Sequence, residues 1–326
     1  MSETGMTRET GSESGTTIER PSGRRRSDRI VGGGRITQDI IDLSMAAAGS
    51  ERPVCISGPQ GSGKEHIARA IHAWSNRSGG PFVVVSCSTV SESLLAREVF
   101  GCAESVHSLM PDEYAGALAR SAGGTALITG VDRLPGALLQ SLAKAVSDGR
   151  FQREGDGAAI PLRARVAVAA TSFPEPFAFE EIAHHRISLL PLDTRREDIL
   201  PLAAHFLRLA ADEAGIVPVG FTADARNALV AEPWTGNVRE LAERVRQAVK
   251  LAGNGAISAE ALLLAADGDN VPSFKDAKRA FETRYVVGLL RRCSGNISRA
   301  ARLAKKDRKD FYDVIRRTGV DPSEFR

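Results

Sequence analysis

Three glycines and a lysine near residue 60 have the spacing of a phosphate-binding loop. The segment Gly58–Glu65 reads Gly-Pro-Gln-Gly-Ser-Gly-Lys-Glu, follows the apolar run Pro53–Ile56 and leads into a helical pattern over Ile67–Trp74. Strand, glycine-rich loop, lysine and helix in this order form a P-loop, whose backbone N–H groups and lysine hold phosphates. A chance glycine-rich turn is the alternative, and the flanking strand and helix favour the P-loop. The residues assigned to the phosphate site are Gly58, Gly61, Ser62, Gly63, Lys64 and Glu65.

The acids that should work beside this loop are missing. Hydrolysis of a bound nucleotide also needs carboxylates that hold Mg²⁺ and orient water. The strand best placed to carry them reads Gly-Thr-Ala-Leu-Ile-Thr-Gly and ends in Thr129 and Gly130. Asp132 is close, but its odd offset from Thr129 directs it to the other face of the strand exit. The pattern therefore predicts phosphate binding without effective hydrolysis.

The surrounding elements predict an α/β core followed by helices. Continuous apolar strands separated by helices, from Ile36 to about Leu190, imply a parallel sheet covered on both faces. The expected strands are Val54–Ser57, Phe82–Ser86, Thr125–Ile128, Val166–Ala170 and Ile187–Leu190, with helices such as Glu65–Trp74, Ser91–Val99 and Pro135–Val146 between them. From Arg195 to about Ala266 only helical patterns remain. These are Asp198–Ala211, Ala223–Ala231 and Val238–Leu251.

The composition is that of an ordinary globular protein. The 326 residues are 42% hydrophobic and 25% charged, enough for two or three domains with a substantial core. No apolar run approaches the roughly 20 residues that span a bilayer, and the N-terminus lacks the apolar core of a signal peptide. The four scattered cysteines have no metal-ligand spacing, so we expect a reduced cytoplasmic compartment, no membrane contact and no metal site.

The charge is distributed unevenly along the chain. Residues 273–326 contain 15 Lys+Arg against 7 Asp+Glu, a balance of +8, so the remaining residues carry −5 of the net +3. A basic end on an acidic chain suggests a nucleic-acid-binding domain. Residues 1–30 are poor in apolar side chains and are expected to be disordered. The arginines at 24–26 could touch nucleic acid, but a solvated tail is the favoured interpretation.

Glu65 and several other strings connect the chain to a known family. Glu65 stands where the common P-loop pattern has the Ser or Thr that meets Mg²⁺. Other characteristic strings are Ala70–His72, Pro81–Val83, Phe100-Gly101, Gly123–Thr125, Arg195–Ile199 and Trp234–Leu241. From about Gly32 to Arg326 the chain resembles the sigma-54-dependent enhancer-binding activators, AAA+ proteins whose P-loop also ends in Gly-Lys-Glu. The string Trp234–Leu241 is the most specific outside the P-loop.

The resemblance implies ATP or ADP as ligand and a core that forms rings. It implies that Gly61, Gly63 and Lys64 hold the nucleotide together with Arg239, whose family counterpart senses phosphate from the helical lid. It also implies that Arg186 reaches the nucleotide of a neighbouring subunit, although Glu180 replaces a second arginine there. The adjacent His184 and His185 are interpreted as plain substitutions, because neighbouring side chains point in different directions.

Three departures argue against an active motor. Thr129 and Gly130 replace the Asp-Glu that ends the family's Walker B strand, and Thr171-Ser172 replaces a Thr-Asn sensor. Ser105–Met110 replaces the Gly-Ala-Phe-Thr-Gly-Ala loop that contacts sigma-54. Losing a catalytic carboxylate typically costs orders of magnitude in rate. We therefore expect weak or no hydrolysis and no standard sigma-54 contact, and the presence of Mg²⁺ stays open.

The C-terminal residues resemble the Fis-type helix-turn-helix that ends these activators. Gly295–Arg302 and Asp307–Tyr312 form the two helices, with Asn296 or Ser298 capping the first and Asp307 the second. Phe311 and Ile315 form a buried stripe on the second helix. The residues expected to contact double-stranded DNA are Lys305, Lys306, Arg308, Lys309, Tyr312 and Arg316. Lys305 stands where the family has a turn glycine, at a cost of roughly 1 kcal/mol.

The preceding helix, Phe274–Arg292, is expected to supply core or dimer contacts. Its apolar residues at helical spacing are Phe281, Tyr285, Val286, Leu289 and Leu290. The predicted organisation is a disordered tail (1–30), an AAA+ nucleotide-binding subdomain (31–192), a helical lid (193–266), a linker (267–273) and a helix-turn-helix domain (274–326). We expect no sensory domain before the core.

The sequence therefore predicts a DNA-binding transcription regulator that binds ATP or ADP without effective turnover. It is expected to dimerise through its C-terminal domain on DNA, to form a possible AAA+ ring, and to act in the bacterial cytoplasm at the nucleoid. RNA polymerase or a related activator is a further possible partner. Two alternatives stay open. One is a modulator or antagonist that mixes into rings of an intact relative, and the other is a functional sigma-54-dependent ATPase.

Overall fold

The computed structural model describes residues 29–104, 106, 112–173, 178–179, 183–217, 219–265 and 274–325. The predicted tail up to residue 28, the predicted linker, Glu180 and all of Ser105–Met110 except Val106 lie outside these ranges. The chain divides into two compact units after Asp198. The domain boundaries given above remain predictions.

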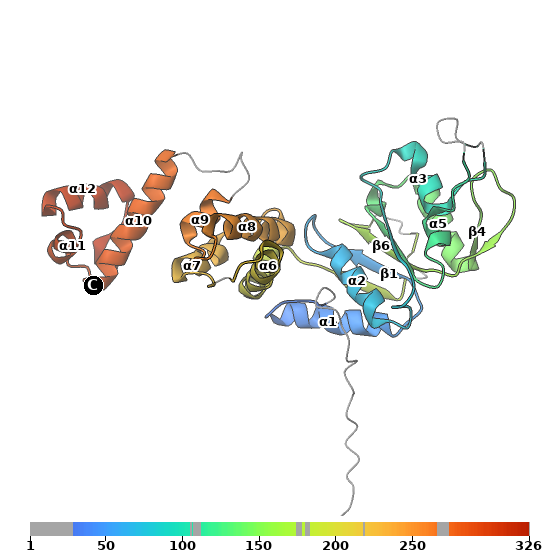
Figure 1. Cartoon of the computed structure of the whole chain (residues 1–326), viewed down its shortest axis with the longest axis horizontal. Coiled ribbons are helices and arrows are strands. Elements are labelled where there is room, and N and C mark those ends of the chain that lie inside the picture. The colour runs from blue at the N-terminus through green and yellow to red at the C-terminus, as the bar shows by residue number, and fades with distance from the viewer. Residues whose placement is uncertain are drawn as a thin grey trace, which may run out of the picture. The chain divides into compact units, whose positions relative to one another are not determined.

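The first unit is built on a parallel five-stranded sheet, which confirms the predicted α/β fold (Figure 1). The strand order is β2-β3-β6-β1-β7, so the P-loop strand β1 lies beside β7, one of the two edge strands. The strands are β1 (Val54–Ser57), β2 (Phe82–Ser86), β3 (Thr125–Thr129), β6 (Arg165–Ala170) and β7 (His185–Ser188). The last strand was predicted at Ile187–Leu190. It begins two residues earlier because His185 pairs with Val54 at the sheet edge, where polar side chains reach solvent.

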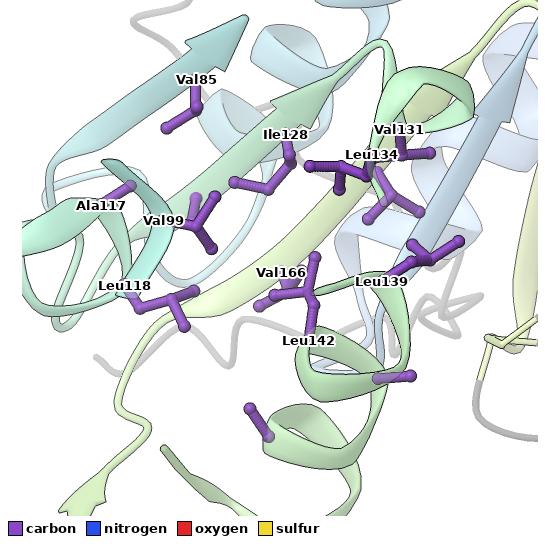
Figure 2. Close-up of a cluster of buried hydrophobic side chains, with 14 of the residues drawn as sticks. Val85, Val99, Ala117, Leu118, Ile128, Val131, Leu134, Leu139, Leu142 and Val166 are labelled. Atoms are coloured by element: carbon purple, nitrogen blue, oxygen red, sulfur yellow. The ribbon is translucent and has the colours of Figure 1, made fainter. Parts of the chain in front are cut away.

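Helices cover both faces of this sheet, as the continuous apolar strands predict. The helices are α1 (Arg35–Ala48), α2 (Lys64–Trp74), α3 (Glu92–Phe100), α4 (Gly116–Arg120) and α5 (Gly136–Asp148). Successive strand residues alternate between two cores: Ile128 packs on one face and Leu127 on the other. Figure 2 shows the first core, where Ile128 and Val166 lie among side chains from α3, α4 and α5. The second core lies under α1 and α2.

A short hairpin and two 3-10 segments of the first unit were not predicted. A two-stranded antiparallel hairpin, β4 (Arg150–Phe151) and β5 (Ile160–Pro161), follows α5. Two 3-10 segments, Val131–Arg133 and Leu192–Asp198, follow β3 and β7. Strands of two residues carry no readable alternation, so pairing with a neighbour decides them.

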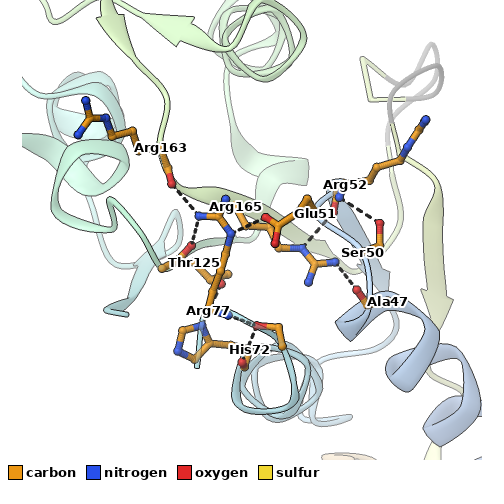
Figure 3. A network of polar contacts seen from close by, with 11 residues as sticks. Ala47, Ser50, Glu51, Arg52, His72, Arg77, Thr125, Arg163 and Arg165 are labelled. Atoms are coloured by element: carbon orange, nitrogen blue, oxygen red, sulfur yellow. Dashed lines mark hydrogen bonds and ion pairs between the residues drawn. The ribbon is translucent and has the colours of Figure 1, made fainter. Parts of the chain in front are cut away.

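A network of arginines lies at the end of the sheet where the strands begin, whereas the P-loop follows the end of β1 (Figure 3). Buried Arg165 donates to the carbonyl oxygens of Ala47 at 2.6 Å and Arg52 at 3.0 Å. Arg77 donates to Glu51 and to the carbonyl of Arg163 at 2.7 Å. These contacts join the end of α1, the entry to β1 and the starts of β3 and β6. These hydrogen bonds therefore connect the segments that precede the strands, at the end of the sheet away from the P-loop.

Among its described residues, the second unit is helical apart from turns, loops and one isolated bridge between Phe221 and Ile257. Its first helices are α6 (Ile199–Ala214), α7 (Ala223–Ala231), α8 (Asn237–Ala252) and α9 (Ala259–Leu264). Thr222 and Ser258 begin α7 and α9, and each side chain accepts a backbone N–H at 3.2 Å. The predicted helix at Asp198–Ala211 begins one residue later, because the Asp198 carboxylate is hydrogen-bonded to Gly33 and Gly34.

Three further helices form a small group with its own core. They are α10 (Phe274–Arg292), α11 (Ile297–Leu303) and α12 (Arg308–Thr318), followed by a 3-10 turn at Pro322–Phe325. The buried residues of this core are Val286, Leu290, Cys293, Ala300, Ala301, Phe311 and Ile315. All four cysteines of the chain are buried free thiols. Within the described residues, no helix combines the length and apolar character that crossing a bilayer requires.

Candidate nucleotide site and nucleic-acid interface

The P-loop leaves the end of β1 in a conformation that only glycine adopts easily. The Gly58 N–H donates to the carbonyl of Ala170 at 3.2 Å. Its φ is +148°, and a Cβ there would lie 2.6 Å from the carbonyl oxygen of Leu189. Gly61 and Gly63 also have positive φ, of 76° and 102°, and Gly63 is the N-cap of α2. The helix α2 therefore begins within the loop, and the N-terminus of a helix favours an anion.

Lys64 lies over this loop. Its ammonium donates to the carbonyl oxygens of Gly58 at 2.6 Å and Pro59 at 2.9 Å. Ser62 is buried, and its hydroxyl oxygen has no hydrogen-bond partner among the described residues. The loop thus combines a cation, the N-terminus of a helix and a hydroxyl without a hydrogen-bond partner among the described residues. This is the donor set that a phosphate group requires.

Glu65 lies outside the loop. Its carboxylate forms an ion pair with Arg69 at 2.8 Å, one turn further along the exposed face of α2. Its side chain is 53% exposed. In this conformation Glu65 is held by a helical i,i+4 pair, so it contributes no ligand to the loop. Its assignment to the nucleotide site remains a prediction.

The end of β3 offers no carboxylate to the loop. The Thr129 hydroxyl donates weakly to the carbonyl of Val85 in β2 at 3.5 Å. Gly130 has a φ of +73°, a left-handed conformation in which a glutamate costs roughly 1–2 kcal/mol. Asp132 is exposed in the following 3-10 segment. Burial, followed by the charge of Asp132, raises the pKa of the Cys87 thiol to about 11.

One strand separates β3 from the P-loop strand. Asp132 follows β3 in the chain, and β6 lies between β3 and β1. The carbonyl of Thr171, after β6, accepts the Gly58 N–H at 3.3 Å, and Thr171 itself is exposed. In the part of the chain that the structure describes, no group of three or more His, Cys, Asp or Glu side chains could hold a metal ion.

Arg186 lies on the edge strand β7, apart from the P-loop of its own chain. It pairs in register with Cys55, which precedes Gly58 by three residues, or about 10 Å along the strand. Arg186 is exposed and lines a hollow of about 400 Å³ with Leu43, Ala183, His184, His185 and Ile187. Burial, then the charges of Arg165, His184 and Arg52, lowers the pKa of His185. Arg186 is thus exposed on the edge strand and separate from the P-loop of its own chain.

Arg239 belongs to the second unit, in the first turn of α8. The preceding Trp234 is buried, donates its ring N–H to the carbonyl of Leu229 at 2.8 Å and lies under Arg244. Glu240 accepts the Gly236 N–H at 2.8 Å and pairs with Arg244 at 2.6 Å. The neighbours of Arg239 in the string Trp234–Leu241 therefore build the lid, and Arg239 itself is exposed.

The residues predicted to bind DNA lie together on exposed surface of the three-helix group. Arg308, Tyr312 and Arg316 follow one another at i,i+4 spacing on the exposed side of α12, while Phe311 and Ile315 are buried in the core. Lys309 lies beside this row, and Lys305 and Lys306 are exposed in the preceding turn. We call the row of Arg308, Tyr312 and Arg316 the basic stripe.

The turn before α12 confirms one expectation and corrects another. Lys305 has a φ of +53°, the left-handed conformation expected where the family has glycine. Asn296 caps α11 by accepting the Arg299 N–H at 3.0 Å. Asp307 occupies the N-cap position of α12, but its side chain makes no capping hydrogen bond, so that part of the prediction is wrong.

Sequence reasoning assigned no role to Arg195 or Asp198. Both are buried, and Arg195 donates to the carbonyl of Ser62 inside the P-loop at 3.1 Å. The available signal was an arginine and an aspartate three residues apart before an apolar helix. This signal is weak because both residue types are usually exposed.

Comparison with known proteins identifies the family. Residues 30–186 match the family described as "Sigma-54 interaction domain", and residues 193–276 match "AAA+ ATPase lid domain". Transcriptional regulatory protein GlrR of Escherichia coli (strain K12) is 31% identical over 299 residues, which cover 88% of this chain and 67% of that protein. The Sigma54-dependent transcriptional activator SfnR of Pseudomonas putida is 36% identical over 238 residues, 70% of this chain and 65% of that protein.

Solved structures lead to the same family. NtrX from Brucella abortus in complex with ADP superposes with a TM-score of 0.65 at 27% identity, covering 90% of this chain and 71% of that one. The same protein in complex with ATP gives a TM-score of 0.63. The resemblance inferred from the sequence is confirmed: this chain belongs to the family of sigma-54-dependent transcriptional regulators, with an AAA+ P-loop core.

Proposed function

We propose that the protein is a sequence-specific DNA-binding transcription regulator that binds ATP or ADP and hydrolyses it weakly or not at all. The observation that carries this proposal is a complete phosphate loop next to a strand end without acids. Gly58, Gly63 and Lys64 have the geometry of a phosphate cradle, while Thr129 and Gly130 occupy the end of β3. Binding depends on the first set and turnover on the second.

The nucleotide proposal is supported by relatives as well as by geometry. NtrX has been solved with ADP and with ATP. In this proposal Arg239 contacts the nucleotide from the lid, and Arg186 contacts the nucleotide of a neighbouring subunit in an AAA+ ring. For Mg²⁺ the fit is poor: Glu65 is paired with Arg69, and β3 ends without a carboxylate. We therefore assign no step to a metal ion.

The expected result of a phosphate-release assay follows from this arrangement. Purified protein with saturating ATP and Mg²⁺ should release phosphate no faster than the Lys64→Ala variant, because the missing carboxylates cost orders of magnitude in rate. Calorimetry with ADP on the same preparation should show binding, which proves that the preparation is active. Sustained phosphate release that Lys64→Ala abolishes would mean that the protein is a working motor.

The DNA-binding proposal depends on the basic stripe and on a second copy of the chain. The stripe presents Arg308, Tyr312 and Arg316 on one face of α12. Phe281 and Tyr285 on α10 are exposed and stack on each other, with ring centroids 6.1 Å apart. Such an apolar surface supports a dimer through the C-terminal helices. A dimer should recognise two half-sites related by two-fold symmetry.

Mapping of DNA occupancy across the genome, followed by binding assays on the sites found, tests this half of the proposal. We expect palindromic sites, and a five- to 150-fold loss of affinity in Arg308→Ala, corresponding to about 1–3 kcal/mol for one base-contacting arginine. Lys278→Ala is the matched control, because it removes one exposed positive charge from α10. Absence of specific sites together with unchanged binding by Arg308→Ala would exclude the helix-turn-helix as a DNA reader.

A role in transcription through RNA polymerase completes the proposal. Family membership supports an effect on transcription at bacterial promoters, in the cytoplasm where the DNA lies. The departure of Ser105–Met110 from the family's sigma-54-contacting pattern argues that this protein affects polymerase without the standard contact.

A further inference from the structure

A buried arginine connects the P-loop to the residue that precedes the first helix of the second unit. Arg195 is 8% exposed and donates from Nη2 to the Ser62 carbonyl oxygen at 3.1 Å. Its Nη1 lies 3.8 Å from Oδ2 of Asp198, which is fully buried. Arg195 has non-helical dihedral angles, φ −124° and ψ 54°, and interrupts the 3-10 segment Leu192–Asp198. Ile199, the first residue of α6, follows directly in the chain.

The Asp198 carboxylate in turn holds the segment before α1. Its Oδ1 accepts the N–H groups of Gly33 at 2.8 Å and Gly34 at 3.0 Å. Its Oδ2 accepts the hydroxyl of Thr37, which is also buried. These contacts span more than 160 residues of sequence. Three donors and one guanidinium therefore surround a single buried carboxylate.

Close packing explains why this segment is made of glycine. A Cβ on Gly32 would lie 2.4 Å from Cγ2 of Thr37 and 2.7 Å from Oδ1 of Asp198. A Cβ on Gly34 would lie 2.8 Å from Oε2 of Glu197. All three distances are shorter than real Cβ contacts, and at Gly32 the neighbours are the buried Thr37 and Asp198, so glycine there lets the backbone approach the carboxylate.

The chain just before this glycine segment also contacts α2, the helix that follows the P-loop. His66, in the first turn of α2, makes a 3.1 Å hydrogen bond through Nε2 with the carbonyl oxygen of Arg29. The P-loop and the segment before α1 are thus connected twice within the first unit. One connection is Ser62 to Arg195 and Asp198 and on to the glycine segment, and the other is the hydrogen bond between Arg29 and α2.

We propose that Arg195 and Asp198 are a positioning pair that couples nucleotide binding at the P-loop to the order of segment 30–37 and of the junction with α6. This proposal rests on the proposed binding of a nucleoside di- or triphosphate. Ser62 lies within the loop whose N–H groups receive the phosphates, and its carbonyl is the acceptor of Arg195. Phosphate binding at the loop therefore stabilises the hydrogen bond from Arg195 to the Ser62 carbonyl. Because such coupling is reciprocal, an intact Arg195–Asp198 pair in turn stabilises the loop conformation that binds phosphate.

Amide hydrogen exchange on the full chain, with and without ADP, tests this coupling. In the native protein ADP should slow exchange in segment 30–37 by about tenfold or more, since a coupling of 5- to 150-fold is typical. The double variant Arg195→Met/Asp198→Asn removes both charges together, so no buried charge is left unpaired. It should bind ADP about five- to tenfold more weakly and lose most of the ADP-dependent protection of this segment.

Two further variants separate coupling from general destabilisation. Asp193→Asn/Arg196→Met changes the same charges at exposed positions of the same 3-10 segment and should behave like the native protein. Thr37→Val removes only the hydroxyl donor to Asp198 and should reduce the ADP-dependent protection even if the double variant fails to fold. Unchanged ADP-dependent protection in Thr37→Val or in a folded double variant would overturn the coupling alone. Absence of ADP binding to the native chain would overturn the nucleotide site itself, and the coupling with it.

Discussion

Replacing Lys64 with alanine is expected to weaken ADP binding by about tenfold to a hundredfold. A hydrogen bond to a charged group contributes about 1.5–3 kcal/mol, and each 1.4 kcal/mol is a factor of ten in affinity. In the present conformation the ammonium occupies the loop by donating to the carbonyls of Gly58 and Pro59. A phosphate offers it stronger, charged acceptors, so this donor should move to the ligand on binding.

The effect on folding should be small by comparison. Loss of the two contacts to Gly58 and Pro59 should cost the unliganded protein about 1 kcal/mol, because alanine suits the first turn of α2. Titration calorimetry with ADP and a thermal melt of the same samples measure both quantities. Lys144→Ala, on the exposed face of α5, is the matched control and should change neither. Native affinity in Lys64→Ala would show that the phosphates are not held at this loop.

Replacing Phe311 with alanine is expected to unfold the three-helix group. Phe311 is 1% exposed and lies at the centre of a core that includes Val286, Leu290, Ala300 and Ile315. Deleting a buried phenylalanine side chain typically costs 3–5 kcal/mol. A domain of roughly 50 residues has little stability to lose, since small cores rarely supply more than 3–5 kcal/mol.

The outcome should differ between the two functions of the chain. Specific DNA binding should disappear in Phe311→Ala, while ADP binding should stay at the native level because the P-loop belongs to the other unit. Fluorescence anisotropy with a DNA site and calorimetry with ADP measure the two functions separately. Leu303→Ala, which truncates a 46% exposed leucine on α11, should leave the domain folded. Native DNA binding by Phe311→Ala would mean that this core does not hold the basic stripe in place.

The strand that leads into the P-loop could be predicted closely because it is a short, buried apolar run. Val54–Ser57 was predicted at its observed bounds, and so was the edge strand Phe82–Ser86, which is half-buried but has four apolar residues in a row. The other edge strand, β7, was misplaced by two residues because its sequence, His-Arg-Ile-Ser, contains a single apolar residue. The cap of α12 was also misjudged: residue type places Asp307 at the N-cap, but whether its side chain accepts a bond depends on local rotamers.

Residue types and spacing were sufficient to predict a phosphate loop, the absence of acids at Thr129 and Gly130, and a basic helix-turn-helix. Each of these is local, so neighbouring residues in the chain carry the information. Three features needed the folded chain: the left-handed backbone of Gly130, the contact of Arg195 with the Ser62 carbonyl, and the burial of Asp198. The physical reason is that each depends on segments that meet only when the sheet is assembled. In the case of Asp198, the hydrogen-bonded partners are more than 160 residues apart.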